Sequence, residues 1–153
     1  APYQVGFTAY STTNSFSLAA GDKVPFNAVG TGFGSFTDRT TYGGTNFYST
    51  SNARFTAPVA GLYLFIVCIY FHSTNSSSLC TIVPRKNGNE MTNGNNTIFF
   101  MSTNGHSEGH APNGSLLLQL DANDYIEVYR RVNQSGTNSC YGSHSHFQGF
   151  LVG

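Results

Sequence analysis

Residues 54–65 read RFTAPVAGLYLF, and they place Pro58 and Gly61 three residues apart between two apolar segments. Proline has no backbone N–H to donate to a sheet, so the strand that begins at Arg54 must end before Pro58. Glycine accepts backbone angles and close approaches that a side chain would forbid. We therefore predict that this stretch is a corner, which carries the chain from one β-sheet to a second one.

The segment after the corner, residues 62–72, is the longest apolar run of the chain. Successive side chains of a strand point to opposite faces, so Tyr63, Phe65 and Val67 share one face. We expect that face to lie in the core. Bulky residues also occupy the other face of the run, which favours a central strand covered on both sides.

Short runs of alternating apolar and polar residues recur along the rest of the chain, and clusters of Gly, Asn and Ser separate them. Pro25 indicates an edge strand, and Asn87-Gly88 is a strong hairpin signal. Ten strands are predicted, at residues 4–10, 23–26, 46–48, 54–56, 62–72, 80–86, 97–102, 115–120, 125–132 and 146–152. No helix longer than a turn is expected. The pattern therefore indicates an all-β sandwich or jelly roll, with residues 1–153 in a single domain.

The composition excludes several classes of function. Charged residues make up 9% of the chain, and Lys+Arg and Asp+Glu are balanced at 7 each, against about 25% charged residues in an average protein. A nucleic-acid partner would require a clustered basic face, so none is expected. No apolar stretch approaches 18 residues, so we expect no membrane insertion. A neutral surface of Ser, Thr, Asn and Gly is typical of extracellular and carbohydrate-facing proteins. The chain begins at Ala1, which indicates a processed product or an excised domain.

Cysteines and glycosylation motifs leave alternatives open. Cys68, Cys80 and Cys140 form either one disulfide and one free thiol or three buried free thiols. Four Asn-x-Ser/Thr motifs begin at Asn75, Asn95, Asn113 and Asn133. They predict a glycoprotein if the chain is secreted, although a chain rich in Asn and Ser also produces such motifs by chance.

Residues 53–65, ARFTAPVAGLYLF, carry the pattern Phe-Thr-x-Pro-x-x-Gly-x-Tyr-x-Phe, matched at Phe55, Thr56, Pro58, Gly61, Tyr63 and Phe65. This pattern resembles the signature of the complement C1q globular head. Four further blocks resemble the same family in the same order: residues 4–10, residues 24–32, the turn 85–88 and the segment 114–129. The C-terminal stretch SHSHFQGFLVG resembles the closing motif of the family, at Phe147, Gly149, Phe150 and Leu151. Asn123-Asp124 replaces the Gly-Asp of the family, the loop 30–52 is long and polar, and no Gly-x-Y collagen stalk is present.

The resemblance implies a ten-stranded jelly roll of two antiparallel sheets, shared with tumour necrosis factor-like domains, and a homotrimer or a heterotrimer of similar chains. It also implies recognition without catalysis. The chain holds 13 Phe and 9 Tyr, and tyrosine suits interfaces because its ring is buried while its hydroxyl finds a partner. Candidate interface residues are Tyr10, Tyr48, Tyr70 and Tyr129. The alternative is that these aromatic side chains fill a large core.

Candidate ligand-binding residues lie in two polar loops. Sugars are bound by aromatic faces and by Asn, Asp and Arg side chains, and the candidates are Tyr42, Asn46, Tyr48, Tyr141 and His144, with Arg39 for an anionic ligand. Arg130-Arg131 is the only adjacent pair of arginines, and at most one of its members faces any given ligand, because adjacent strand residues point opposite ways.

Candidate metal ligands are few. Several members of the family bind calcium, which takes oxygen ligands, so Ca²⁺ is considered at Asp38, Asp121 and Asp124. Asp124 alternatively caps its own turn. Histidines offer two further sets: His144 with His146, repeated three times in a trimer, and His106 with Glu108 and His110. The alternative for both sets is ordinary surface histidines.

An enzyme is not expected. Cys80 lies in an apolar run without the local sequences of catalytic cysteines, and paired carboxylates are scarce. Two functions remain. The first is a secreted trimeric recognition protein, lectin-like, that binds glycans or microbial and cell-surface patterns in innate defence. The second is a trimerisation or adhesion head at the tip of a collagen-like or fibre stalk, including a viral or bacterial host-attachment module.

Overall fold

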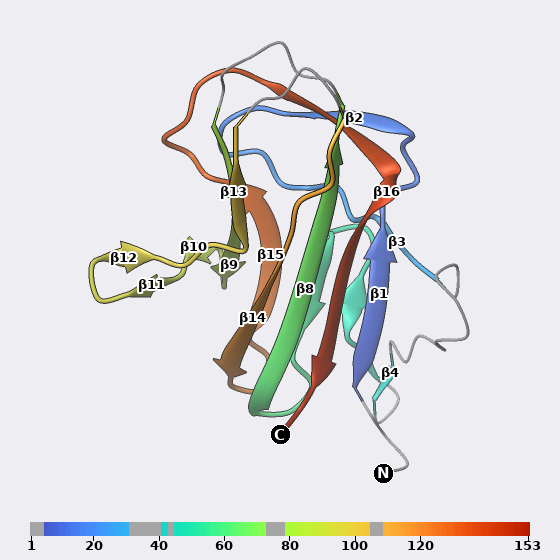
Figure 1. Cartoon of the computed structure of the whole chain (residues 1–153). Helices are drawn as coiled ribbons and strands as arrows, with labels where there is room; N and C mark the ends of the chain where they lie inside the picture. The colour runs from blue at the N-terminus through green and yellow to red at the C-terminus, as the bar shows by residue number, and fades with distance from the viewer. Residues whose placement is uncertain (1–4, 31–40, 43–44, 73–78, 105–108) are drawn as a thin grey trace.

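The computed structural model describes residues 5–30, 41–42, 45–72, 79–104 and 109–153. Every regular element among these residues is a β-strand, and two six-stranded antiparallel sheets are packed face to face (Figure 1). No helix able to cross a membrane occurs in this part of the chain. The predicted all-β sandwich of two antiparallel sheets is therefore confirmed.

One sheet, called here the β8 sheet, has the strand order β14-β8-β16-β1-β3, with β2 paired to β16. Its strands are β14 (Asn113–Leu120), β8 (Gly61–Phe71), β16 (Asn138–Leu151), β1 (Gly6–Tyr10), β3 (Ala28–Val29) and β2 (Ser15–Leu18). The long run predicted at residues 62–72 is β8, and it lies between β14 and β16, as expected of a central strand.

The other sheet, called here the β15 sheet, has the order β10-β9-β15-β7-β6, with β13 paired to β9. Its strands are β10 (Asn89–Glu90), β9 (Cys80–Lys86), β15 (Tyr125–Arg130), β7 (Arg54–Thr56), β6 (Tyr48–Ser49) and β13 (Met101–Thr103). Two small hairpins complete the described elements: β4 (Thr41–Tyr42) with β5 (Thr45–Asn46), and β11 (Thr92–Asn93) with β12 (Asn96–Thr97). The β11–β12 hairpin projects away from both sheets (Figure 1).

The predicted corner joins the two sheets. β7 belongs to the β15 sheet and β8 to the β8 sheet, so the chain changes sheets across Pro58 and Gly61. A Cβ atom on Gly61 would lie 2.6 Å from Leu151 Cδ1 and 2.8 Å from the carbonyl oxygen of Gly153. Such distances leave no room for a side chain, so glycine is required here by close packing of the C-terminal segment.

Aromatic rings fill the space between the sheets. Ring centroids of Phe7 lie 4.9 Å from Phe147 and 5.0 Å from Phe55, and those of Phe65 and Phe147 lie 5.7 Å apart. A Cβ atom on Gly149 would lie 2.6 Å from Phe7 and 2.8 Å from Phe65, so this glycine leaves room for both rings. Tyr63, Phe65 and Val67 are fully buried, as predicted. Of the remaining family-motif residues, Phe55 and Phe147 are buried, whereas Pro58 and Phe150 are only partly buried.

The strand boundaries differ from the prediction at several places. The described residues form sixteen strands instead of ten, and many of the additional strands have only two residues. Residues 23–26 form no strand, and their contact with β15 is an isolated β-bridge between Lys23 and Tyr129. Parts of the strand predicted at residues 97–102 belong to β12 and β13. β2 was not predicted. β16 begins at Asn138, before the predicted start at residue 146. Its first half was missed because a register shift between Tyr141 and His146 interrupts the alternation of apolar and polar residues that revealed its second half.

Candidate functional site

The outward side of β8 is apolar along most of its length. Because Tyr63, Phe65 and Val67 point into the core, the alternate residues point outward. These are Leu62, Leu64, Ile66, Cys68 and Tyr70, and all of them are only partly buried. A strand whose outer side met only water would carry polar residues there. The outer face of the β8 sheet is therefore a candidate contact surface.

The strand register extends this face over neighbouring strands. Residues directly opposite each other in antiparallel strands share a face, and Leu64 is opposite Leu117 of β14 and Phe150 of β16. An apolar row therefore crosses three strands, and Leu117 is 57% exposed at its edge. A second row places Ile66 beside Gln148.

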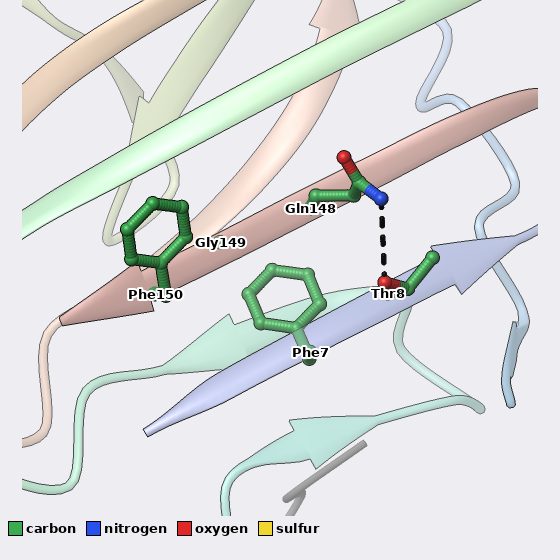
Figure 2. A pocket seen from close by; sticks show the side chains of 5 residues that line it. All are labelled: Phe7, Thr8, Gln148, Gly149 and Phe150. Atoms are coloured by element: carbon green, nitrogen blue, oxygen red, sulfur yellow. Dashed lines mark hydrogen bonds between the residues drawn. The ribbon is translucent and has the colours of Figure 1, made fainter. Parts of the chain in front are cut away.

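A pocket of about 210 Å³ opens between β1 and β16 and is lined by Phe7, Thr8, Gln148, Gly149 and Phe150. Figure 2 shows the rings of Phe7 and Phe150 beside the Thr8–Gln148 pair, in which the Gln148 amide donates to Thr8 Oγ1 at 3.4 Å. Since Gly149 has no side chain, the Phe7 ring comes close to β16 from the core side. The pocket is consequently apolar apart from one polar pair that is bonded within itself.

Aromatic and imidazole rings gather at one end of the β8 sheet. This aromatic cluster consists of Tyr70, His72, Tyr141 and His144: the Tyr141 centroid lies 4.0 Å from His72 and 5.6 Å from Tyr70, and Tyr70 lies 5.2 Å from His144. Its position follows from the register shift between Tyr141 and His146. Ser145 stabilises the irregular segment, because its hydroxyl accepts from the Tyr70 N–H at 3.0 Å and donates to the Tyr141 carbonyl at 2.7 Å.

The cluster contains two of the predicted ligand-binding residues, Tyr141 and His144, and one predicted interface residue, Tyr70. His72 was missed, although it has the same parity as Tyr70 in the strand predicted at 62–72. Tyr42 and Asn46 belong to β4 and β5, whose backbones pair with each other, and Arg39 lies outside the described residues.

The prediction for Tyr48 is wrong in both of its roles. Tyr48 is 2% exposed, and its ring centroid lies 4.9 Å from that of Phe7 in the core. Its hydroxyl donates to the Phe26 carbonyl at 2.7 Å, and burial raises the pKa of this phenol. A side chain enclosed by its own chain reaches neither a ligand nor a partner chain.

Tyr10 and Tyr129, the remaining interface candidates, lie on different sheets. Tyr10 is opposite His146 on the outer face of the β8 sheet, where burial lowers the pKa of His146. Tyr129 belongs to β15, and the guanidinium of Arg85 lies 3.8 Å from its ring. The four predicted interface tyrosines therefore do not form one surface.

Charged side chains on the β15 sheet form an ion-pair group around the buried carboxylate of Glu127. Glu127 is 2% exposed, and its Oε2 atom accepts from Lys23 and, at 3.2 Å, from Arg54. The Arg54 guanidinium also lies 4.0 Å from the Tyr125 ring. In the doubled pair, Arg130 is fully buried and Arg131 is partly exposed, which confirms that at most one of the two can face a ligand.

The carboxylate of Asp124 is engaged in its own turn. Oδ1 accepts from the Asn87 side chain at 2.8 Å, while Oδ2 accepts from the Asp121 N–H at 2.9 Å and lies 2.9 Å from Lys86 Nζ. The Asn87 hydrogen bond, followed by those from Asp121 and Lys86, lowers the pKa of Asp124 to about 2. This geometry matches the capping alternative, and Asp121 contributes its backbone to the turn.

No group of three His, Cys, Asp or Glu side chains that could hold a metal ion occurs among the residues that the structure describes. His106, Glu108 and Asp38 lie outside those residues. His110 is described: its ring stacks on Phe71 at 5.4 Å, and its Nε2 atom lies 3.1 Å from Thr103 Oγ1.

We expect the Asp124 turn to make stability depend on acid pH. A lowered folded-state pKa means that the carboxylate stabilises the fold fully above its unfolded pKa, near 4, and loses this effect as the pH falls towards 2. Urea unfolding of the wild type and Asp124→Asn should therefore differ most at pH 6 and converge at pH 2. Asp121→Asn is the matched control and should retain the pH dependence of the wild type. A difference independent of pH would contradict this account.

The three cysteines are free thiols in the structure, and only Cys68 departs from the second alternative, because it is partly buried. Cys80 and Cys140 are fully buried between the sheets. Burial raises the pKa of Cys80 to about 11, whereas a nucleophilic cysteine needs a lowered pKa. The chemistry of these thiols is that of core residues.

Comparisons with known proteins place the chain in a family. The family model described as C1q domain matches residues 6–152. The globular domain of zebrafish complement 1qA protein has a similar structure, with a TM-score of 0.62, 16% identity, and coverage of 99% of this chain and 98% of that one. The Eiger TNF structure from S. frugiperda also has a TM-score of 0.62, with 14% identity and coverage of 98% and 93%. No curated protein sequence matches the chain.

Proposed function

This chain belongs to the C1q domain family, and from that premise we propose that it is a secreted, non-enzymatic recognition domain that works as a homotrimer and binds glycans. Residues 1–153 would form one such domain. The observation that carries the proposal is the apolar outer face of the β8 sheet, which one subunit by itself leaves partly exposed.

The apolar face supports self-association. Leu62, Leu64 and Ile66 alternate with core residues along β8. They could turn into the core only if the strand shifted its register by one residue, and that shift would move the core residues outward. A large exposed apolar patch is typical of a protein–protein contact. Tyr10 lies on the same face and would contribute a ring whose hydroxyl group stays near the rim of the contact, whereas Tyr70 belongs to the aromatic cluster.

The aromatic cluster supports a carbohydrate ligand. Sugars offer apolar C–H faces to aromatic rings and hydroxyl groups to nearby polar atoms, and Tyr70, Tyr141 and His144 supply both kinds of partner within one small area. The low charge of the chain, 9%, also suits a neutral ligand. Tyr42, Asn46 and Arg39 stay predictions for the same role.

The glycosylation motifs differ in their fit to a trimer. Asn113 is exposed on the outer face of the β8 sheet, opposite Cys68, where an attached glycan would obstruct association. Asn95 lies between β11 and β12 and Asn133 follows β15, and both are exposed away from that face. We therefore expect modification at Asn95 and Asn133 and none at Asn113.

A glycan array combined with sedimentation equilibrium tests the proposed function. The wild-type protein should sediment at about three times the subunit mass at micromolar concentration and bind at least one class of glycan. Tyr141→Ala should weaken that binding at least about tenfold, because aromatic anchors dominate binding energy. The matched control is Tyr125→Ala, which removes a tyrosine of the β15 sheet and should leave glycan binding unchanged.

The same experiment separates the alternative function. A stable trimer that binds no charged or neutral sugar would end the carbohydrate proposal and favour a trimerisation or adhesion head on a collagen-like or fibre stalk. A monomer at micromolar concentration would contradict both functions.

A further inference from the structure

We propose that Leu117 of each subunit inserts into the pocket between β1 and β16 of the neighbouring copy. The inference rests on the proposed trimer and adds which residues of the two copies meet. The proposal is based on three features of the outer face of the β8 sheet. These are an exposed leucine, an apolar pocket, and a distance between the two that one chain cannot close.

Leu117 is the projecting element. At 57% exposure it is the most exposed large apolar side chain among the residues that the structure describes. It lies on β14, which ends the strand order of the β8 sheet, and its outward neighbours on that strand are the polar Ser115 and Gln119. A single leucine thus stands out from a polar edge and continues the apolar row through Leu64 and Phe150.

The pocket is the receiving element. It measures about 210 Å³, and an apolar cavity of about 150 Å³ already accepts a benzene molecule, so the side chain of leucine fits. The partly buried Phe150 supplies apolar lining, Phe7 lies behind Gly149 and is only 1% exposed, and the polar pair of Thr8 and Gln148 is hydrogen-bonded within itself (Figure 2). Such a lining favours an aliphatic occupant over a polar one.

Leu117 cannot fill the pocket of its own subunit. Both lie on the outer face of the same sheet, but β8 and β16 separate β14 from β1. With strands about 4.8 Å apart, the leucine and the pocket are about 10–14 Å apart. Only a second copy can join them. Because the two patches differ, the contact is heterologous, and a heterologous contact whose rotation closes generates a ring of the kind a trimer requires.

Disulfide cross-linking tests the contact directly. We would combine Leu117→Cys with Gln148→Cys in a Cys68→Ser background, which removes the native thiol of the same face, and oxidise the protein with glutathione disulfide. Non-reducing gels should show covalent dimers and, predominantly, covalent trimers, with nothing larger. The control pair, Leu117→Cys with Tyr125→Cys, places one thiol on the other sheet and should remain uncross-linked.

Sedimentation of the wild type makes the two failures distinguishable. If the wild type is a trimer and the Leu117–Gln148 pair does not cross-link, this inference is overturned while the proposed function stands. If the wild type is a monomer, both are overturned. As a second measurement, Leu117→Asp should raise the concentration at which the trimer dissociates at least about tenfold, since burial of a leucine is lost. Leu79→Asp is the matched control, because Leu79 is an exposed leucine, at 46%, next to β9 of the other sheet. If the trimers of the two variants dissociate at the same concentration, the proposed contact is refuted.

Discussion

Replacement of Arg130 by methionine is expected to lower the free energy of unfolding by about 3–5 kcal/mol, because several hydrogen bonds of a charged group are lost. Arg130 is 0% exposed, and no carboxylate forms an ion pair with it among the described residues. Its guanidinium instead donates to backbone carbonyls of four residues: Leu18 at 2.8 Å, Leu79 at 3.1 Å, Ser135 at 2.8 Å and Gly136 at 2.6 Å. Methionine would remove four hydrogen bonds of a charged donor, each worth about 1.5–3 kcal/mol, and would leave the buried Leu18 carbonyl without that donor.

The carbonyls come from three separate parts of the chain. Leu18 ends β2, Leu79 precedes β9, and residues 135–136 lie between β15 and β16. Arg130 therefore connects the two sheets at one end of the sandwich. The planar guanidinium has five N–H donors, whereas the ammonium group of lysine has three, so Arg130→Lys should retain part of the stability that Arg130→Met loses.

Urea unfolding at neutral pH measures these differences. Arg131→Met is the matched control: Arg131 is adjacent in the sequence but its side chain is 33% exposed, so we expect a loss of less than about 1 kcal/mol. An Arg130→Met variant as stable as the control would show that the buried guanidinium does not hold the three segments together.

Truncation of Phe65 to alanine is the second large effect, with an expected loss of about 3–5 kcal/mol. Phe65 is fully buried, and its ring centroid lies 5.5 Å from Phe55, 5.7 Å from Phe147 and 6.5 Å from Phe7. Removal of the ring would leave a cavity bordered by residues of both sheets, and the rigid neighbouring rings could collapse into it only in part. Tyr63→Ala should cost about the same, since Tyr63 is also fully buried.

Tyr63→Phe is the control for ring packing. It keeps the ring and removes only the hydroxyl, which donates to the Val59 carbonyl at 2.7 Å, so we expect a loss of about 1 kcal/mol. Thermal or urea unfolding of the three variants gives the comparison. If Phe65→Ala and Tyr63→Ala both melt with the wild type, the inward face of β8 has been assigned to the wrong side.

Features that depend on neighbouring residues were predictable from the sequence. The corner at Pro58 and Gly61 follows from a missing N–H group and a missing side chain, and the inward face of β8 follows from strict alternation. The hairpin at Asn87-Gly88 follows from a backbone preference, and both residues have positive φ values, 52° and 86°. The family pattern combines these local requirements, which explains why fold class and family could be inferred together.

Features that depend on distant residues were not predictable in the same way. Tyr48 lies in the core, where its hydroxyl donates a hydrogen bond to the Phe26 carbonyl. The residues that adjoin Tyr48 in the sequence do not indicate that this acceptor will be nearby. The aromatic cluster depends on the register shift in β16, and the pocket depends on the pairing of β1 with β16 across some 140 residues.

By itself, therefore, the sequence determined the sandwich, its corner and the side of each long strand that turns inward, because bonded geometry and side-chain alternation act within a few residues. Only the tertiary structure decided which tyrosines are enclosed, which carbonyls Arg130 satisfies, and where an apolar face stays uncovered. Those outcomes depend on which strands lie side by side, and that is determined by packing between segments far apart in the chain.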